Sequence, residues 1–242
     1  MVIGVYSIKG GVGKTTLAVN LAWCAAALSS RRTLLWDIDP QSAASFLIGS
    51  DTPPKSEAEA VYRERIRPRK LIQQTATDRL ALLRADSSLR GLDQRFRLSS
   101  KKRLTRLIRE VSEDYDRIIL DCPPGLHETS DQMIRAADLI IVPVIPSPLS
   151  QRAFDEVVAH IEQEHKGRTA ILPVHTMVDR RRTLHLAALD AHRKWPIIPY
   201  ASVAEQMAKR REPVGAFAPR SPAAQAFARL WRGIERRIAK GF

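Results

Sequence analysis

Short runs of apolar residues, each of strand length, alternate along the chain with longer stretches in which apolar positions recur at helical spacing. Most of the short runs lack polar alternation, which is typical of strands covered on both faces. The runs are Val2–Ile8, Thr33–Trp36, Leu80–Leu83, Arg117–Leu120, Leu139–Val144 and Thr169–Val174. The helical stretches are Lys14–Leu28, Lys101–Ser112, Ser130–Ala136, Leu149–His165 and Thr183–Lys194. This alternation predicts an α/β fold: a doubly wound, mostly parallel sheet with helices on both faces.

A single domain accounts for the length of the chain. Its 242 residues are enough to bury one sizeable core, and nothing in the pattern requires a second one. We therefore expect residues 1–242 to form one domain. The segment from about Gly49 to Thr77 carries prolines and many charges without a clear period, so we expect it to be a loop with short helices and a variable insertion.

The composition, 44% hydrophobic and 27% charged, is that of a folded, water-soluble protein. No apolar run reaches the roughly 18 residues of a membrane-spanning helix. The N-terminus lacks the basic segment and cleavage site of a signal peptide, so we expect a cytoplasmic protein. The two cysteines, Cys24 and Cys122, cannot alone form a disulfide framework or a four-ligand metal site, and we expect packed thiols.

The net charge of +13 points to an anionic partner. DNA, RNA and an anionic membrane would all satisfy such an excess of positive charge. Charge alone does not choose among them, and a basic surface that only keeps the protein soluble is the simpler alternative.

A glycine-rich loop follows the first apolar run directly and precedes a helical stretch, which is the context that a phosphate-binding loop requires. The loop consists of Lys9, Gly10, Gly11, Val12, Gly13, Lys14, Thr15 and Thr16. Its glycines let backbone N–H groups and the helix N-terminus point at phosphate oxygens. Lys14 would neutralise the β- and γ-phosphates, and the Thr15 hydroxyl would bind Mg²⁺. A glycine-rich turn without a ligand is the alternative.

Carboxylates stand at the carboxyl ends of two apolar runs, where doubly wound sheets bind ligands. Strand alternation places Asp37 and Asp39 on the same face, so that both could approach a metal and an attacking water. A helix cap ahead of Ser42–Leu47 is the alternative, since aspartate caps helices well. Asp121 ends the run Arg117–Leu120 and could hold the water shell of Mg²⁺.

The loop departs from the general phosphate-loop pattern at one point: Ile8 stands where glycine is usual, and Lys9 follows it. This deviant Walker A sequence resembles that of the ParA/MinD class of ATPases, in particular the short ParA partition and positioning proteins. The resemblance implies that Lys9 reaches across a dimer interface to the phosphates held by the partner subunit. It also implies that Asp39 positions the attacking water, that Asp121 is the Walker B aspartate, and that the turn Pro123–Gly125 after it is the second switch. The implied catalytic residues are Lys9, Lys14 and Asp39, and the implied metal-binding residues are Thr15, Asp39 and Asp121.

The resemblance covers nearly the whole chain, because Ala137–Pro148 and Ile198–Ala224 keep the spacing of the later ParA regions. Nitrogenase iron proteins share a loop of the Lys9 type but need cysteines that hold an iron–sulfur cluster between subunits. Cys24 and Cys122 lie inside the nucleotide-binding elements, which argues against that class.

The resemblance implies an ATP-dependent switch that forms a homodimer, binds DNA without sequence preference and hydrolyses ATP weakly with Mg²⁺ until a partner stimulates it. The implied partner is a ParB-like protein or a cargo adaptor, and the implied cargo is a plasmid, a chromosome or a protein cluster. The implied location is the cytoplasm, in association with the nucleoid. A module that assembles on nucleotide without turnover is a further class, against which Asp39 argues.

Candidate DNA-binding residues follow from charge and not from a match. Tyr200 and Val203 stand where some relatives carry arginines for DNA. The nearest candidates are Lys209, Arg210, Arg211 and Arg220, and further candidates are Arg180, Arg181, Arg182, Arg193 and Lys194. A solvated charged face is the alternative for each cluster.

Two further features leave alternatives open. Relatives often carry an asparagine near the adenine where this chain has His175, Thr176 and Met177; His175 could equally be a core histidine, and ATP follows from the resemblance only. The stretch Phe227–Ile238 has apolar residues at helical spacing with arginines between them. It suits either a helix packed on the sheet or a MinD-like membrane-binding helix, and its lead-in Ser221–Ala224 favours packing.

Overall fold

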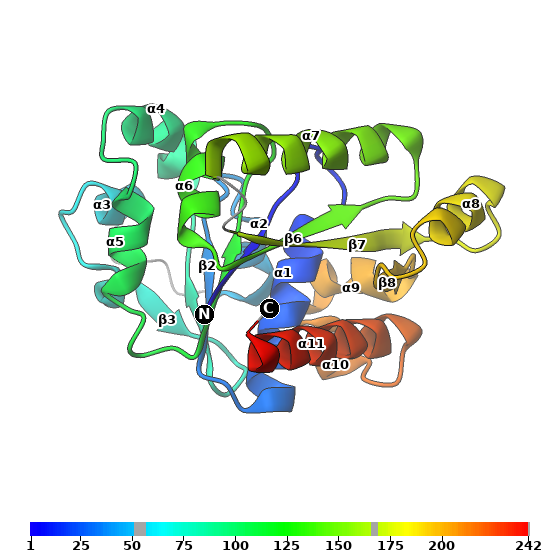
Figure 1. Ribbon diagram of the computed structural model, residues 1–242. Coiled ribbons are helices and arrows are strands. Elements are labelled where there is room, and N and C mark those ends of the chain that lie inside the picture. The colour runs from blue at the N-terminus through cyan, green and yellow to red at the C-terminus, as the bar shows by residue number, and fades with distance from the viewer. Residues whose placement is uncertain (51–56, 166–168, 242) are drawn as a thin grey trace.

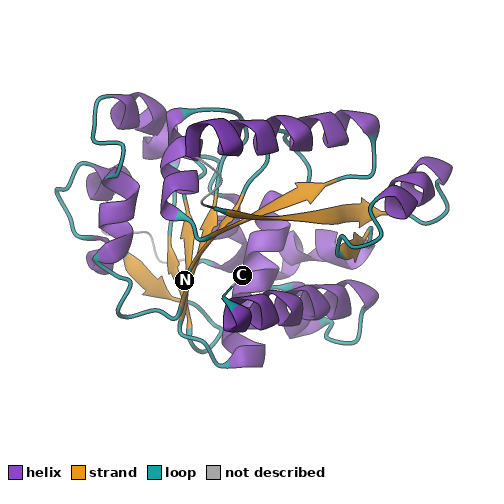
Figure 2. Cartoon of the chain, in the orientation of Figure 1, coloured by secondary structure: helices purple, strands orange, loops and turns teal. Residues whose placement is uncertain are grey.

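One sheet organises the molecule. The computed structural model describes residues 1–50, 57–165 and 169–241, and in them eight strands pair in the order β3-β4-β2-β5-β1-β6-β7-β8. The strands are β1 (Val2–Val5), β2 (Thr33–Asp37), β3 (Ile72–Gln74), β4 (Leu80–Leu83), β5 (Arg117–Asp121), β6 (Leu139–Val144), β7 (Ala170–Val178) and β8 (Ile197–Pro199). All neighbours are parallel except β3 and β4. The predicted fold class is confirmed (Figures 1 and 2).

Helices cover both faces of this sheet (Figure 1). One layer contains α3 (Glu59–Tyr62), α4 (Leu92–Arg97), α5 (Arg103–Arg109), α6 (Glu128–Ala136) and α7 (Pro148–His165). The other contains α1 (Lys14–Trp23), α2 (Ala43–Ile48), α9 (Ser202–Arg210), α10 (Val214–Phe217) and α11 (Pro222–Lys240), while α8 (Thr183–Ala191) lies beyond the end of β7. Strand residues alternate between the layers: Leu34 and Trp36 pack in the first, and Leu35 packs in the second. Two covered faces explain the continuous apolar runs.

Several boundaries differ from the predicted ones. The first strand ends at Val5 and not at Ile8, because the chain turns there into the glycine-rich loop. The first helix ends at Trp23 and continues as a π-helical turn, Cys24–Leu28. The strands β3 and β8 were not predicted, because three residues are too short for a periodic signal.

The expected insertion at 49–77 falls partly on residues 51–56, which lie outside the described residues. Its described part contains α3, the 3₁₀ turn Pro68–Lys70 and β3. That this segment varies, and that residues 1–242 are one domain unit, remain predictions.

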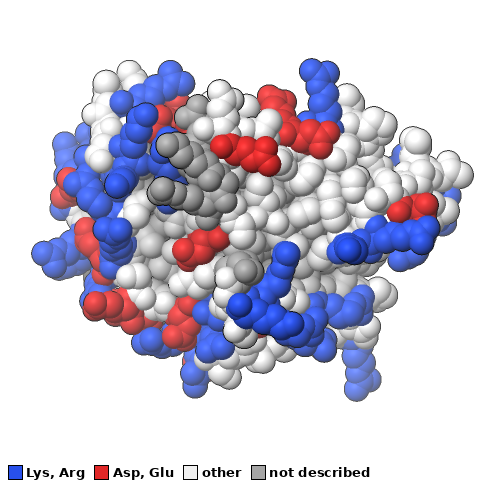
Figure 3. Space-filling model, viewed as in Figure 1, with Lys and Arg blue, Asp and Glu red and all other residues white. Residues whose placement is uncertain are grey.

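Basic side chains gather over two parts of the face in Figure 3: over α11 and the neighbouring end of the sheet, and over the α4–α5 end. The exposed cations of α11 are Arg229, Arg232, Arg236, Arg237 and Lys240. On this face, two groups of basic side chains are therefore separated from each other.

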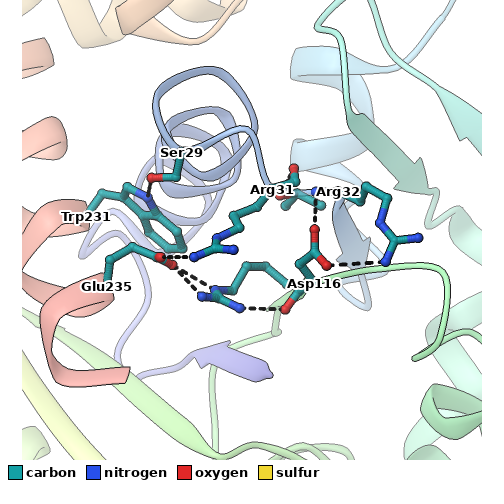
Figure 4. A network of polar contacts seen from close by, with 8 residues as sticks. Ser29, Arg31, Arg32, Asp116, Trp231 and Glu235 are labelled. Atoms are coloured by element: carbon teal, nitrogen blue, oxygen red, sulfur yellow. Dashed lines mark hydrogen bonds and ion pairs between the residues drawn. The ribbon is translucent and has the colours of Figure 1, made fainter. Parts of the chain in front are cut away.

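The apolar face of α11 is buried within the fold. Trp231 is fully buried, and its indole Nε1 donates a hydrogen bond of 2.9 Å to the Ser29 hydroxyl. Glu235 accepts a hydrogen bond of 2.8 Å from Nε of the buried Arg117 and also pairs with Arg31 (Figure 4). This covered face supports the packing interpretation of the C-terminal stretch over a membrane-binding tail. No helix in the described ranges combines the length and apolarity needed to cross a bilayer.

Candidate nucleotide-binding site

The loop between β1 and α1 has the backbone conformation of a phosphate cradle. Gly11 and Gly13 have φ of +71° and +89°, in the left-handed region that favours glycine. Gly13 is also the N-cap of α1, so the N-terminus of that helix opens onto the loop. A Cβ added at Gly10 or Gly11 would meet no atom within 4 Å, so this side of the loop is open. Exposed N–H groups at a helix N-terminus form an anion site.

Two lysines converge on this loop. Lys14 is buried, and its Nζ donates a hydrogen bond of 3.1 Å to the Lys9 carbonyl oxygen. Burial lowers the pKa of Lys14, while the charges of Asp121 and Asp39 act in the opposite direction. Lys9 is half-buried and its Nζ donates a hydrogen bond of 3.1 Å to the hydroxyl of Ser150, at the start of α7. Without nucleotide, both ammonium groups are thus held by groups of their own chain.

Asp121 presents a buried carboxylate without a hydrogen-bond partner of normal geometry in the described structure. It ends β5, in register with Val5 of β1 and Asp37 of β2. Burial raises the pKa of Asp121 well above its usual value, the Asp37 charge raises it further, and the nearby Thr15 hydroxyl lowers it. An unpaired buried carboxylate is costly unless a cation or a bound water satisfies it. The carboxylate beside the Thr15 hydroxyl therefore fits a hydrated magnesium ion.

The two aspartates after β2 have different surroundings, contrary to the expectation that both approach the metal and the water. Both carboxylate oxygens of Asp37 are occupied, one by the Asp39 N–H at 3.1 Å and the other by the Ser45 N–H and hydroxyl at 2.9 and 2.7 Å. Burial raises the pKa of Asp37 to about 6. Because Ser45 lies in the first turn of α2, the helix-cap alternative applies to Asp37. Asp39 is half-buried and accepts one hydrogen bond, from the Gln41 N–H, which leaves it available for a ligand.

Carboxylates alone do not complete a metal site. The described residues contain no group of three or more histidine, cysteine, aspartate or glutamate side chains placed to hold a metal ion. A magnesium ion would need the Thr15 hydroxyl, water and phosphate oxygens as its other ligands.

An apolar pocket adjoins the phosphate loop, and its full lining was not predicted from the sequence. It has a volume of about 190 Å³ and is lined by Gly13 and Thr16, by the end of β7 at Thr176 and Met177, and by the end of β8 with the two residues that follow it, 199–201. Its polar rim is formed by Tyr200, whose hydroxyl donates a hydrogen bond of 3.1 Å to Glu205. The pocket suits a flat, largely apolar ring such as a nucleobase. Two sequence signals pointed to this place: the carboxyl ends of two strands, and the resemblance, which placed His175, Thr176 and Met177 near the adenine.

Two neighbouring residues of β7 have separate roles. The Thr176 hydroxyl donates a hydrogen bond of 2.9 Å to the Val12 carbonyl and so fixes the phosphate loop to β7. His175 is buried against Trp195, with ring centroids 4.8 Å apart. Burial lowers the pKa of His175 and favours its neutral form. The core alternative therefore applies to His175.

The turn after β5 carries Pro123 at the edge of the site. Pro123 is half-buried and directly follows Cys122, a free and fully buried cysteine whose thiol pKa is raised by burial. Gly125 has φ of +100°, and its carbonyl accepts a hydrogen bond of 2.8 Å from the Tyr6 hydroxyl. The turn is thus tied to the strand that precedes the phosphate loop. Cys24 and Cys122 are packed thiols, as expected.

The four candidate DNA-binding residues are not equivalent. Lys209 and Arg220 are exposed, and the Arg210 guanidinium lies 4.9 Å from the centroid of the Phe217 ring. Arg211 ends α9 in the left-handed conformation and donates hydrogen bonds of 3.0 and 2.6 Å to the carbonyls of Phe46 and Gly49. These bonds fix α9 to the end of α2, so Arg211 has a structural role that the sequence did not reveal.

Comparisons with known proteins show the family and the fold. A family model described as AAA domain matches residues 1–172. The sporulation initiation inhibitor protein Soj of Bacillus subtilis is 28% identical over 250 residues, covering 96% of this chain and 97% of Soj. Among solved structures, the McdA-ATP complex from Cyanothece has a TM-score of 0.84 at 20% identity, covering 98% of this chain and 96% of that chain.

The septum site-determining protein MinD from Pyrococcus horikoshii, in complex with Mg-ADP, has a TM-score of 0.79 at 23% identity and covers 96% of this chain and 95% of that chain. At these identities the two structures show the shared fold. The family match and the relatives together place the sequence: the chain belongs to the AAA domain family and, within it, to the ParA/MinD class of P-loop ATPases.

Proposed function

We propose that the protein is a magnesium-dependent ATPase that dimerises on ATP and acts as a partition or positioning switch. The observation that carries this proposal is the phosphate loop that contains Lys9 and Lys14, with the unpaired, buried carboxylate of Asp121 close enough to Lys14 for their charges to interact. The loop N–H groups and Lys14 bind the β- and γ-phosphates of ATP. Thr15 and Asp121 hold Mg²⁺, directly or through its water shell, and the ion neutralises phosphate charge.

Two further side chains, Asp39 and Lys9, take part in hydrolysis. Asp39, half-buried beside the site, orients the attacking water. Lys9 leaves its hydroxyl partner on α7 and contacts the phosphates bound by the other subunit, where its charge stabilises the transition state. The base lies in the pocket beside Met177 and Tyr200, next to Gly13. A monomer therefore binds ATP but lacks one cation of the complete site.

Phosphate release from purified protein with Mg-ATP tests the catalytic assignment. The reaction includes DNA and any candidate partner, and Asp39→Ala is the control. We expect turnover in the wild type and none in the variant. Equal rates would remove Asp39 from the mechanism. Lys9→Ala tests the action across the interface: if it dimerises on ATP as the wild type does, Lys9 does not bridge the subunits.

We also propose non-specific DNA binding through basic residues on the α9–α11 side, with Lys209, Arg210 and Arg220 as the principal candidates and Arg180, Arg181, Arg182, Arg193 and Lys194 as further ones. The charge of +13 supports this proposal, as does the exposure of Lys209 and Arg220. A ParB-like protein or a cargo adaptor would stimulate hydrolysis, and the cycle would position a plasmid, a chromosome or a protein cluster over the nucleoid. ATP-dependent binding to duplex DNA that does not weaken as salt rises would contradict a phosphate-contacting surface.

A further inference from the structure

A groove lies between α11 and the edge of the sheet, apart from the phosphate loop. Its volume is about 780 Å³, within the range of about 300–1,000 Å³ that is usual for ligand clefts. Half-buried apolar residues of the sheet edge, among them Ile171, Trp195 and Ile197, form one side. Leu230 and Ile234 of α11 contribute to the other side. Because part of this apolar surface is accessible, an occupant can gain free energy by covering it.

Five cationic side chains surround the groove, and none of the described residues that line it is acidic. They are Arg180, Lys194, Arg229, Arg236 and Arg237, and all five are exposed. None of them forms an ion pair within the described residues. In contrast, Arg63 and Arg95 share Glu59, and Arg31 and Arg117 share Glu235. The groove therefore combines an apolar floor with uncompensated positive charge.

The sheet edge at the groove is only partly paired. β8 pairs with β7 between His175 and Val178, and in the described structure the first half of β7 has a strand neighbour only on the β6 side. The His175 N–H donates to the Pro196 carbonyl, while the Ala170 N–H donates to Asp138 on the opposite side. Strand alternation then places the N–H and C=O of Ile171 on the groove side. An extended chain can pair there at Ile171 over a short length, because Pro173, the next residue of β7 on this side, has no N–H to donate.

We propose that this groove binds an acidic, extended segment of a partner protein. Its backbone pairs with β7 at Ile171, its apolar side chains contact the half-buried Ile171 and Trp195, and its carboxylates lie against Arg236 and Arg237. DNA fits this groove less well, because phosphates pair with the cations but leave the apolar floor uncovered. The proposal does not depend on ATP hydrolysis, and it assigns Arg180 and Lys194, two of the further DNA-binding candidates, to the groove instead.

A short fluorescent peptide that alternates glutamate and valine is the probe, with fluorescence anisotropy of the full-length protein without nucleotide as the readout. We expect Arg236→Glu combined with Arg237→Glu to weaken binding about tenfold or more, a loss of about 1.4 kcal/mol. The matched control is Lys101→Glu with Lys102→Glu. It makes the same change in net charge on two exposed lysines near α5, and it should change the affinity by less than about threefold, the size expected of remote, screened charges.

A second peptide, with serine in place of valine, tests the apolar floor and should bind about tenfold more weakly to the wild type. The proposal is overturned if both peptides bind alike, or if the groove and control variants bind the first peptide equally. It is also overturned if the wild type binds duplex DNA or phosphatidylserine vesicles through these arginines and does not bind the peptide. Circular dichroism verifies the fold, and Arg236→Gln with Arg237→Gln replaces a variant that unfolds.

Discussion

At the scale of single residues, the buried carboxylate of Asp121, which we propose binds magnesium, also destabilises the folded protein when no ligand is bound. Its folded-state pKa is raised above the unfolded value of about 3.9, so the native state binds this proton more tightly and loses stability as pH rises above about 4. We expect Asp121→Asn to be more stable than the wild type without nucleotide, by about 1–3 kcal/mol at pH 7, because no buried charge remains unpaired. The advantage should shrink at pH 4. Urea unfolding at both pH values measures it.

Asp116→Asn is the control for that substitution, because we expect it to change the stability in the opposite direction. Asp116 accepts a hydrogen bond of 2.8 Å from the Arg32 N–H, and this bond is the largest cause of its lowered pKa. Its replacement should reduce stability at neutral pH. Asp121→Asn should also lose most of the thermal stabilisation that Mg-ATP gives the wild type. A variant that is less stable than the wild type at pH 7, or that keeps the full stabilisation, would show that Asp121 has another partner.

Ser150 is the second residue with a specific prediction, because it holds Lys9 in the isolated chain. Removing the hydroxyl frees the lysine, and one hydrogen bond contributes about 0.5–1.5 kcal/mol. We expect Ser150→Ala to dimerise at an ATP concentration about two- to tenfold lower than the wild type requires. Light scattering coupled to size exclusion measures this midpoint. Ser150→Ala with Lys9→Ala should not dimerise at all, and an unshifted midpoint in the single variant would exclude a restraining role for Ser150.

At the scale of elements, periodicity located most of the long strands and helices, because covered strands are continuously apolar and helices keep one apolar face. It missed α9, and it ended the strand β7 at Val174 instead of Val178. Residues 80–83 and 139–144 were predicted with their observed bounds. Contacts between side chains of distant segments could not be predicted from the sequence. Only the structure shows that Ser45 donates hydrogen bonds to the Asp37 carboxylate, while the Asp39 carboxylate stays available for a ligand. The resemblance placed Met177 near the adenine, but the other walls of the pocket were not predicted, since they come from separate segments of the chain.

The helix α11 yields a prediction about the C-terminal region. The Trp231 ring is fully buried and its indole N–H reaches Ser29, so the helix is part of the core. We expect Trp231→Ala to lower the free energy of unfolding by about 3–5 kcal/mol and Trp231→Phe by about 1 kcal/mol, mainly the lost hydrogen bond. Urea denaturation measures both changes. Unchanged stability in Trp231→Ala would favour a detachable, membrane-binding helix.

At the scale of the whole molecule, the separation of positive charge into two regions makes DNA binding testable by location (Figure 3). Each phosphate contact contributes about 0.9 to the slope of log affinity against log salt concentration. Lys209→Glu and Arg220→Glu should therefore each weaken ATP-dependent DNA binding and reduce this slope by about 1. Lys101→Glu with Lys102→Glu, at the α4–α5 end, should leave the slope unchanged, and titration in increasing salt measures all three. Arg211→Ala should instead lower thermal stability, because its guanidinium connects α9 to α2. A slope that falls only in the Lys101 and Lys102 variant would move the DNA surface to the opposite end of the molecule, where the arginines of α3 to α5 would have to carry it.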